Sequence, residues 1–409
     1  MKNKRFFALF LGGVVLLVAP ACQKTNGVSS LPPEGSDRPA EISRHIGWAL
    51  FRQELQTKPG QNVLLSPYSI QTVLSMALNG ARGKTAEELL RFMDCAGCAT
   101  ADLNAAHREL NALLTTQSGH PTVTVANRYF FDPKRIQVQA PFLQTLEAYY
   151  QSGADALNFD AEPAALQHIN GWVKTQTKEK IEKIVERISP LDVAFLINAL
   201  HFKADWATPF APQLTRKMPF RRADGSEVLV DFVHADRDFT YATTAQFNLV
   251  DLPFRDSTYS LSLIQPSPAN TDARWYLQLT PQVLHNGYDS IRYGRAEVFF
   301  PKLRLEYEND LIASLRALGV QSAFSEQEAD FSLMGKHPGG KNIFINQVRH
   351  KAVLAVDEKG AEGAAVTSVG FGMTSVPPQF RFDRPFVIVL RHIPTQAMLF
   401  IGYVADPRF

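Results

Sequence analysis

Apolar residues recur at helical spacing through most of the first half of the chain. The segment 41–56 carries them on two sides of a helix, which predicts that this helix is largely buried. The same half contains one predicted strand, Val123–Phe131. The predicted helices are Glu41–Gln56, Ser69–Asn79, Thr85–Met93, Ala101–Thr116, Pro141–Ser152 and Pro163–Lys178.

Alternating and continuous apolar runs replace the helical spacing in the second half, and they predict strands. One helix is expected among them, over Glu308–Leu318. Because helices come first and strands follow, the pattern indicates the α+β class rather than alternating α/β. No linker-like stretch follows Pro39, so residues 41–409 are expected to form one domain. The predicted strands are Ala194–Phe202, Glu227–His234, Asn248–Pro253, Tyr259–Gln265, Glu297–Leu305, Lys351–Val356, Pro385–Arg391 and Met398–Val404.

The first residues have the features of an export signal. Lys2, Lys4 and Arg5 precede an apolar run, Phe6–Val18, which is too short to span a bilayer comfortably. Small residues follow up to Cys22, so we expect a signal peptide over residues 1–21. The polar, Pro- and Ser-rich residues 22–40 are then expected to form a flexible tether.

These residues leave two fates open for the new N-terminus. Ala19-x-Ala21 fits ordinary signal cleavage, whereas the small residues before Cys22 resemble a bacterial lipobox, which would make Cys22 a lipidation site. Both interpretations place the cleavage before Cys22, and they differ only in whether lipid is attached to it. We favour an outer-membrane or cell-surface lipoprotein over a periplasmic or extracellular protein. Membrane contact is expected only through this lipid.

Composition narrows the classes of partner. The chain has 409 residues, of which 45% are hydrophobic and 20% charged, as in ordinary globular proteins. Its 42 basic and 40 acidic residues give a net charge of +2, which argues against a nucleic-acid partner. Apart from Cys22, the cysteines are Cys95 and Cys98, too few ligands for a zinc site. We expect a local disulfide or two free thiols there, and no metal.

The motifs of common enzymes are absent or incomplete. The segment Gly335–Asn342 matches the phosphate-binding Gly-x₄-Gly-Lys, but Asn342 replaces the hydroxyl residue that would bind Mg²⁺, so we interpret it as a turn. Gly83-Lys84-Thr85 lacks the first glycine of that motif and is interpreted as a loop before a helix that Thr85 caps. Neither His-Glu-x-x-His nor Gly-x-Ser-x-Gly occurs. The sequence therefore predicts neither an enzyme nor a cofactor.

Eight sequence blocks, in order from residue 62 towards the C-terminus, resemble those of serpins, a family of serine protease inhibitors. The resemblance implies the serpin fold: a helix-rich first half packed on large mixed and antiparallel β-sheets, with an exposed reactive-centre loop. A monomer is the expected state. The blocks are "NVLLSPYSI" (62–70), "LNGARGKTAEEL" (78–89), "INGWVKTQTKEKIEKIV" (169–185), "FLINALHFKADW" (195–206), "FFPKLRLE" (299–306), "LGVQSAF" (318–324), "HKAVLAVDEKGAEGAAVTS" (350–368) and "RPFVIVLRH" (384–392).

The resemblance implies a suicide-substrate inhibitor whose reactive-centre loop lies at about 358–378. A serine protease (a cysteine protease is the weaker alternative) would cleave the loop and be trapped as an acyl-enzyme while the loop inserts into the central sheet. Counting from Glu358, as in other serpins, places the scissile bond at Thr374–Ser375, and a shift by one residue gives Met373–Thr374. The hinge residues implied by the match are Glu358, Gly360, Ala361, Glu362, Gly363, Ala364, Ala365, Val366 and Thr367.

Side-chain size along the hinge suits insertion as a strand. Since side chains alternate across a strand, Ala361, Gly363, Ala365 and Thr367 would face inward and Glu362 outward. A bulky or charged inward residue would block entry between existing strands, and the inward residues here are small. An inserted segment of about sixteen residues would span roughly 50 Å, enough to carry an attached protease from one pole to the other.

Six residues in other blocks resemble the serpin controls on opening of the central sheet. Four of them resemble the cluster that governs separation of the central strands, and two resemble residues near the point of first entry. One of these two, Lys302, is expected to partner Glu358. Without the resemblance, His350 and Trp206 would be interpreted as buried core residues. The cluster is Ser66, Ser69, Asn198 and His350, and the entry pair is Trp206 and Lys302.

The loop sequence also limits the protease targets. No Lys or Arg occurs from Gly360 to Gln379, which disfavours trypsin-like proteases because their primary pocket takes a cation. Phe371, Met373 and Thr374 instead suit elastase-, chymotrypsin- or subtilisin-like proteases. The alternative function is a non-inhibitory serpin-fold binding or chaperone protein whose loop is merely cleaved. The small hinge residues favour inhibition.

Overall fold

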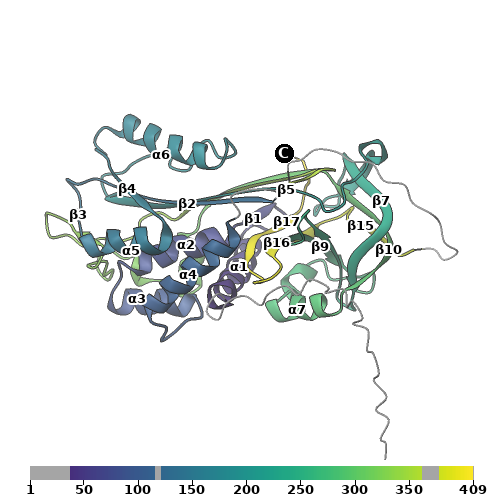
Figure 1. The fold of residues 1–409 in the computed structure, drawn as a ribbon, viewed down its shortest axis with the longest axis horizontal. Helices are drawn as coiled ribbons and strands as arrows, with labels where there is room; N and C mark the ends of the chain where they lie inside the picture. The colour runs from purple at the N-terminus through teal and green to yellow at the C-terminus, as the bar shows by residue number, and fades with distance from the viewer. Residues whose placement is uncertain (1–36, 116–120, 362–376, 409) are drawn as a thin grey trace, which may run out of the picture. The chain divides into compact units, whose positions relative to one another are not determined.

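Helices come first along the chain in the computed structural model, which describes residues 37–115, 121–361 and 377–408 (Figure 1). Helix α2 begins at Pro67, where the missing N–H of proline leaves no hydrogen bond unmet. Later helices are shorter and stand among strands. The helices are α1 (Asp37–Thr57), α2 (Pro67–Leu78), α3 (Gly83–Phe92), α4 (Thr100–Leu114), α5 (Ala140–Tyr150), α6 (Glu162–Gln176), α7 (Pro281–Asp289) and α8 (Ile312–Ala317), with short 3₁₀ turns at Pro212–Leu214, Trp275–Gln278 and Ser322–Phe324.

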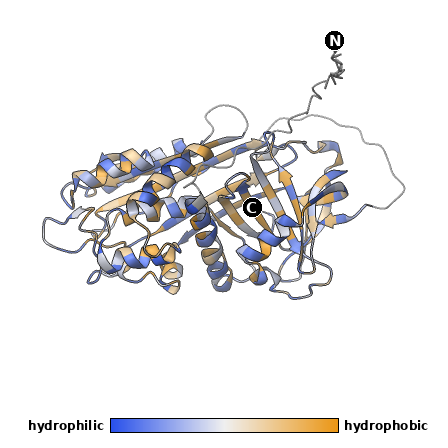
Figure 2. Ribbon diagram, turned by 60° about the horizontal axis from the view of Figure 1, so that its bottom comes forward, coloured by the Kyte–Doolittle hydropathy of each residue, from blue (hydrophilic) through white to orange (hydrophobic). Residues whose placement is uncertain are grey.

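The largest sheet has nine strands, in the order β1-β17-β16-β9-β8-β7-β10-β15, with β6 paired to β7. Every residue of β16 and β17 is buried, and both strands are apolar except for Arg391 and His392 at the end of β16. Figure 2 shows orange, hydrophobic ribbon in many of the strands. Only the β10–β15 pair is parallel among the described pairs of this sheet. Its strands are β1 (Val63–Leu65), β6 (Arg216–Arg221), β7 (Glu227–Thr243), β8 (Phe247–Pro253), β9 (Tyr259–Pro266), β10 (Arg292–Pro301), β15 (Gln379–Arg381), β16 (Phe386–His392) and β17 (Met398–Val404).

Two further sheets carry the candidate site. One has the order β14-β5-β2-β4, and the other consists of the antiparallel pair β11–β13. Burial alternates along β5 and β13, as expected of strands with one face on a core. The strands are β2 (Thr122–Phe131), β4 (Gly153–Ala156), β5 (Ala194–Asp205), β11 (Leu303–Asp310), β13 (Arg349–Val356) and β14 (Gly360–Ala361); β3 (Gln137–Val138) and β12 (Gly335–Lys336) pair separately.

Helices cover both faces of the β5-β2-β4 sheet. Helix α6 lies on one face, and α2, α4 and α5 lie on the other (Figure 1). Beneath α6, Ile169 and Val173 join Phe130 and Phe195 of the sheet in a small apolar cluster that is separate from the main core. The helix is therefore held to the sheet by a limited contact, while α2 belongs to the extensive core on the opposite face.

The α+β class is confirmed, and several element predictions need correction. Helix α1 already begins at Asp37 and buries Ala40, so the domain starts before residue 41 and the last residues of the expected tether are helical. The predicted helix Glu308–Leu318 is too long, because residues 308–310 continue β11 and Glu308 pairs with Lys351 of β13 at 2.8 Å. A cross-strand partner that is distant in sequence outweighs the local helical pattern there.

Other differences have similar causes. The predicted strand Glu297–Leu305 is two strands, β10 and β11, which belong to different sheets and part at Lys302. Thr85 does not cap a helix, because it lies inside α3 and its hydroxyl instead accepts from the Asp330 N–H at 3.1 Å. Helix α7 and strand β6 were not predicted. The Gly335–Asn342 segment combines the short strand β12 with a turn in which Gly340 has φ +70°.

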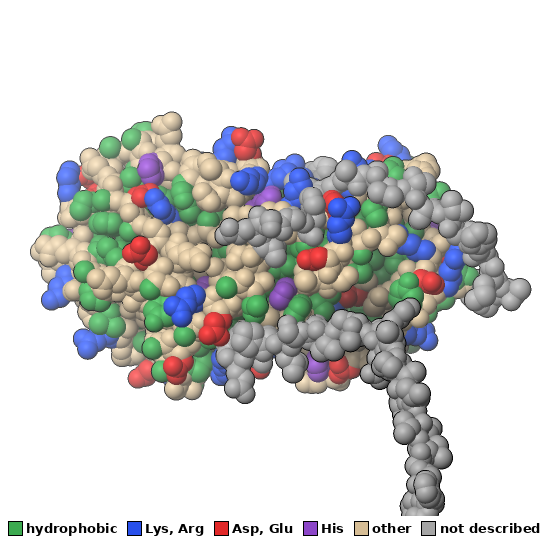
Figure 3. Space-filling view, viewed as in Figure 1, with side chains coloured by type: hydrophobic (Ala, Val, Ile, Leu, Met, Phe, Trp, Pro, Cys, Tyr) green, Lys and Arg blue, Asp and Glu red, His purple; other side chains and the backbone are tan. Residues whose placement is uncertain are grey.

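In the described part of the chain, no helix is both long and apolar enough to cross a membrane. Within residues 37–115, 121–361 and 377–408, no three His, Cys, Asp or Glu side chains come together as a metal site would require. Positive and negative side chains are scattered among each other on the face shown in Figure 3.

Candidate functional site

Two neighbouring strands, β5 and β13, each pair on one side only along most of their length. β5 pairs with β2 from Ala194 to Lys203, and β13 pairs with β11 along all of its residues. On the facing sides, the sole strand contact among the described residues is short β14, which pairs with β5 at Gly360↔Asp205 and Ala361↔Ala204. The two sheets are thus separated by a gap that is bridged at one end.

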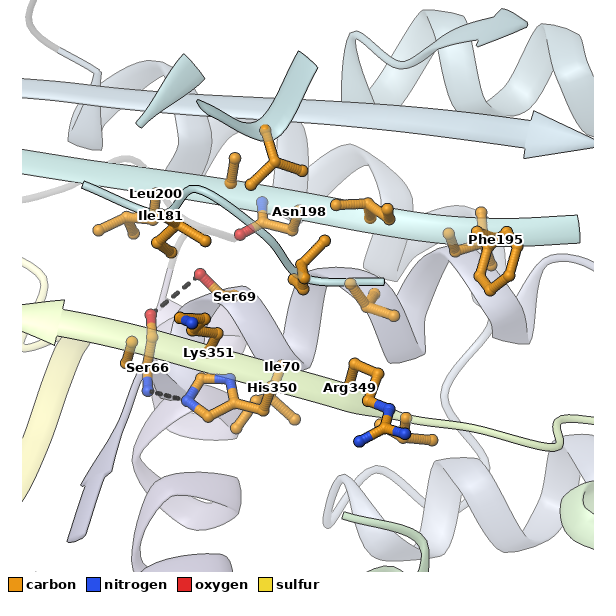
Figure 4. Close-up of a pocket in the computed structure, with 18 of the residues that line it drawn as sticks. Ser66, Ser69, Ile70, Ile181, Phe195, Asn198, Leu200, Arg349, His350 and Lys351 are labelled. Carbon is orange, nitrogen blue, oxygen red and sulfur yellow. Dashed lines mark hydrogen bonds between the residues drawn. The ribbon is translucent and has the colours of Figure 1, made fainter. Parts of the chain in front are cut away.

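A cavity of about 200 Å³ occupies this gap. Its walls come from β5, β13 with the segment that precedes it, one side of α2, and the segment that follows α6 (Figure 4). Apolar side chains such as Ile70, Ile181 and Phe195 line much of it, and several polar residues stand among them, of which four lie near the start of α2 and the facing strands. These four are Ser66, Ser69, Asn198 and His350, the cluster expected from the sequence.

Hydrogen bonds hold three of these residues together. The Ser66 hydroxyl donates to the Ser69 hydroxyl at 2.9 Å, and the Ser66 backbone N–H donates to His350 Nε2 at 3.2 Å (Figure 4). Ser66 precedes α2 with an extended backbone, which is why its N–H is available. Burial lowers the pKa of His350 to about 4, so the ring is neutral near pH 7 and its Nε2 can accept. The start of α2 is thereby tied to β13.

Asn198 faces this group from β5 across the cavity. Its Nδ2 donates at 2.8 Å to Oδ1 of Asn127, the residue opposite it on β2. Asn127 Nδ2 in turn donates to the Tyr150 carbonyl at the end of α5, at 2.7 Å. Asn198 Oδ1 is buried and has no hydrogen-bond partner among the described residues. A buried acceptor without a hydrogen bond is costly unless a donor can arrive there.

Glu358 anchors the bridged end of the gap. Its carboxylate lies 2.7 Å from Lys302 Nζ and accepts from the Thr215 hydroxyl at 2.6 Å. Burial alone would raise the pKa of Glu358, but the hydrogen bonds from Lys302 and Thr215 outweigh it and hold the pKa below its usual value. The carboxylate is therefore charged near pH 7, with its charge neutralised locally.

The backbone after β13 is fixed as tightly as this carboxylate. Trp206 donates from its indole to the Asp357 carbonyl and from its backbone N–H to the Lys359 carbonyl, each at 2.9 Å. The Phe210 N–H reaches the Glu358 carbonyl at 2.8 Å. Trp206 is buried and stacks on Phe254 with ring centres 4.6 Å apart, so it is a rigid support. The chain therefore enters β14 in a defined direction.

Residues 360 and 361 have no room for larger side chains. Gly360 has φ +144°, and a Cβ there would lie 2.1 Å from the Ala204 carbonyl oxygen. Ala361 is 1% exposed beside Ala204. Glycine followed by a small residue is what allows the chain to turn into the gap against β5.

Comparisons with known proteins identify the family that has this arrangement. The family model described as Serpin (serine protease inhibitor) matches residues 41–407. The chain belongs to the serpin family. As a member of this family of protease inhibitors, it is not an enzyme.

Similar proteins support the same assignment along the whole domain. Iripin-2 from Ixodes ricinus is 33% identical over 379 residues, which cover 89% of this chain and 92% of that protein. Leukocyte elastase inhibitor from Xenopus tropicalis is 29% identical, with 89% of this chain and 98% of that protein covered. The native-state crystal structure of the thermophilic serpin Tengpin has a TM-score of 0.81 at 28% identity, covering 91% of this chain and 94% of that one. The serpin fold expected from the sequence is thus confirmed.

The structure of this serpin divides the predicted site residues into three groups. Four lie together at the cavity, and Trp206, Lys302, Glu358, Gly360 and Ala361 lie at the bridged end. The predicted contact between Lys302 and Glu358 is present. The third group lies outside the described residues: Cys22, Glu362, Gly363, Ala364, Ala365, Val366, Thr367, Met373, Thr374 and Ser375.

Sequence reasoning missed three residues of the candidate site. Thr215 and Asp357 fix the hinge, the latter by accepting from the Lys359 and Gly360 N–H groups at 2.8 and 3.3 Å. Asn127 supports Asn198. Asn127 could have been noticed because it is a polar residue within the largely apolar strand Val123–Phe131. Thr215 gave no such signal, because it stands in a stretch without any periodic pattern.

Proposed function

We propose that this serpin inhibits serine endopeptidases as a suicide substrate. A target protease would cleave a bond within the segment that follows Ala361. The part of that segment still attached to Ala361 would then enter the gap between β5 and β13 as a new strand. The protease, still joined as an acyl-enzyme, would be carried along and held. The observation that carries this proposal is the pairing of Gly360 and Ala361 with β5 at one end of an otherwise open gap.

The existing pairs set the register of the proposed strand. Continuing antiparallel from Ala361↔Ala204, Glu362 would lie opposite Lys203 and Thr367 opposite Asn198. Ala361 faces the core, so Gly363, Ala365 and Thr367 would face it too. The Thr367 hydroxyl would then arrive as a donor where Asn198 Oδ1 lacks one. Register, side-chain size and polar pairing all favour the same insertion.

The free energy available is large enough to trap a protease. The exposed edge of β5 is long enough for on the order of ten ladder hydrogen bonds, each contributing about 0.5–1.5 kcal/mol net. That sum rivals the whole stability of a typical domain. The uncleaved form would be held kinetically, because the intact loop cannot enter along its full length.

The proposed targets are elastase-, chymotrypsin- or subtilisin-like proteases. The absence of Lys and Arg from Gly360 to Gln379 leaves nothing for a trypsin-like primary pocket. One similar protein carries the name leukocyte elastase inhibitor, which agrees with a small or apolar bait residue. Thr374 is the proposed bait residue, with Met373 as the alternative.

Gel electrophoresis in SDS after mixing with each protease tests the proposal. We expect a covalent complex with at least one of the three classes, and mass spectrometry of the adduct should locate the ester at Thr374 or Met373. Ala365→Arg should abolish the complex and leave a cleaved substrate, because an inward arginine blocks entry. The matched control is Ala364→Arg, which places the same charge on the outward face and should still trap. Equal trapping by both variants would contradict insertion.

Cleavage without trapping identifies the alternative function, a non-inhibitory binding or chaperone protein. The unfolding temperature before and after nicking separates the two. Insertion should raise it strongly, since a full strand is added to the sheet, whereas a merely cut loop should leave it unchanged.

Export is part of the proposal, on the strength of the first 22 residues alone. We propose cleavage before Cys22 and attachment of lipid to it. Mass spectrometry of the N-terminal peptide from the native host should find a lipid-modified cysteine. An unmodified Cys22 at the N-terminus would instead support plain secretion.

A further inference from the structure

The Cys-x-x-Cys motif forms a disulfide in the loop between α3 and α4. Cys95 and Cys98 are joined, with their Cα atoms 5.4 Å apart. The two sulfurs have different surroundings: Cys95 is fully buried in the core, whereas Cys98 is partly exposed. Ala96 and Gly97 between them are exposed, so a small molecule can approach Cys98 from solvent. The bond is far in sequence from the hinge and plays no part in the proposed insertion.

Arg38 at the start of α1 reaches this disulfide. Its Nε lies 3.4 Å from Cys95 Sγ, and its Nη2 lies 4.0 Å from Cys98 Sγ. Nη2 also donates to the Asp94 carbonyl at 2.7 Å, which fixes the guanidinium over the loop. A guanidinium beside sulfur contributes little to a neutral disulfide but stabilises a thiolate strongly. The arrangement is thus suited to the reduced state as well as to the oxidised one.

Local backbone geometry adds to this effect. Helix α4 starts at Thr100, directly after Cys98 and Ala99, and no side chain caps its first turn. The N–H groups there place positive partial charge near Cys98, which Asp102 in the same turn partly offsets. Arg38, which also pairs with Glu41 at 3.3 Å, is therefore the main positive neighbour of the disulfide.

We propose that Cys95–Cys98 is a thiol–disulfide exchange site for small thiols and dithiols, with Cys98 as the attacked sulfur. The thiolate of the reductant forms a bond to Cys98 Sγ, the Cys95–Cys98 bond breaks, and its electron pair leaves on Cys95 as a thiolate beside Arg38. The second thiol of the dithiol then attacks the reductant sulfur that is bonded to Cys98, and Cys98 is released as a thiolate. The dithiol is oxidised to a cyclic disulfide by two electrons, and the protons of its thiols pass to the cysteines or to water.

Arg38 is a positioning residue in this reaction, since it stabilises the leaving thiolate. A lower thiolate energy makes the disulfide easier to reduce at equilibrium and speeds departure of the leaving group. Arg38 also keeps the loop attached to α1 through the Asp94 carbonyl, a contact that does not involve either sulfur. Reduction should therefore leave the fold intact.

Reduction of the folded full-length protein by dithiothreitol tests the proposal. Samples are quenched with an alkylating reagent, and mass spectrometry follows the peptide that contains Cys95 and Cys98. This peptide is separate from the one that contains Cys22. We expect complete reduction without denaturant and without change in circular dichroism. Arg38→Gln should lower the equilibrium constant for reduction about tenfold and the rate about threefold, as a thiolate pKa raised by about one unit implies. Arg38→Lys, which keeps the charge, should recover most of both.

Controls separate this role from a merely structural one. Arg52 is exposed on the same helix, so Arg52→Gln should react like the unaltered protein. With limiting glutathione, the mixed disulfide should be found on Cys98. The proposal is overturned if reduction requires denaturant, if Arg38→Gln matches the unaltered protein, or if glutathione is found on Cys95. None of these readouts depends on protease inhibition.

Discussion

Lys302 and Glu358 form an ion pair of 2.7 Å at the end of the gap where the hinge enters the sheet. Lys302 stands between β10 and β11, at the point where the chain leaves one sheet for another, and Glu358 follows β13. Thr215 donates to the same carboxylate oxygen. Lys302, Thr215 and Glu358 thus join three separate segments around the residues that would begin insertion.

Replacing Lys302 should destabilise the protein through the carboxylate that is left behind. Lys302→Met leaves the buried Glu358 charge with the Thr215 hydroxyl as its main side-chain partner, and we expect the free energy of unfolding to fall by about 1.5–3 kcal/mol. Urea unfolding at pH 7 measures this change. In the background of Glu358→Gln, the same Lys302→Met substitution should cost much less. Equal costs in both backgrounds would mean that the pair is not coupled.

Gly360→Ala should disrupt the turn into β14. The new Cβ would meet the Ala204 carbonyl at 2.1 Å, and φ +144° is strained for any other residue. We expect a loss of about 1–3 kcal/mol in unfolding free energy, together with a larger number of inhibitor molecules consumed per protease trapped. Gly171→Ala in α6 is the control, since it has open space around it and should be neutral or slightly stabilising. A tolerated Gly360→Ala would show that the turn can relax.

Acid should weaken the fold through His350. Its pKa is lowered to about 4 by burial, so the folded protein favours the neutral ring more than the unfolded chain does. Stability from this group is therefore complete above the ordinary pKa of about 6.5 and falls as the pH drops from there towards 4. We expect His350→Gln to reduce the stability loss between pH 7 and 4.5 by about 2 kcal/mol, measured by urea unfolding.

Two other histidines contribute to the same pH dependence and provide the comparison. Burial lowers the pKa values of His107 and His392 to about 4 as well, so part of the acid sensitivity should persist in His350→Gln. If the pH dependence were unchanged in that variant, the ring of His350 would not be the neutral acceptor of the Ser66 N–H.

The proposed register predicts a specific crosslink. After cleavage, Thr367 should lie directly opposite Asn198, so Thr367→Cys combined with Asn198→Cys should form a disulfide. The bond should not form before cleavage. Thr367→Cys combined with Leu196→Cys places the second cysteine two residues away on the same face and should crosslink poorly. Mass spectrometry of the nicked protein distinguishes the two pairs, and efficient bonding of the second pair would mean that the register is wrong.

Patterns in the sequence were enough for much of the fold and for part of the site. The strand over Met398–Val404 coincides with β17, because a continuous apolar run between turns has few other solutions. The cluster around Ser66 and His350 was reached through matching blocks, and its hydrogen bonds are present. Glu308 was misassigned because local spacing predicts the strand that contains Lys351 but cannot show that Lys351 pairs with Glu308.

Local sequence pattern was sufficient for most of the helices and strands, for the small size of the hinge residues, and for the absence of a cation in the loop that would attract a trypsin-like protease. These properties depend on neighbours in the chain. The tertiary structure alone decided that β5 and β13 lie beside each other without pairing, that Thr215 shares the Glu358 carboxylate with Lys302, and that Arg38 lies over the Cys95–Cys98 bond. Such contacts join residues far apart in sequence, and they exist only once the core has packed the elements that carry them.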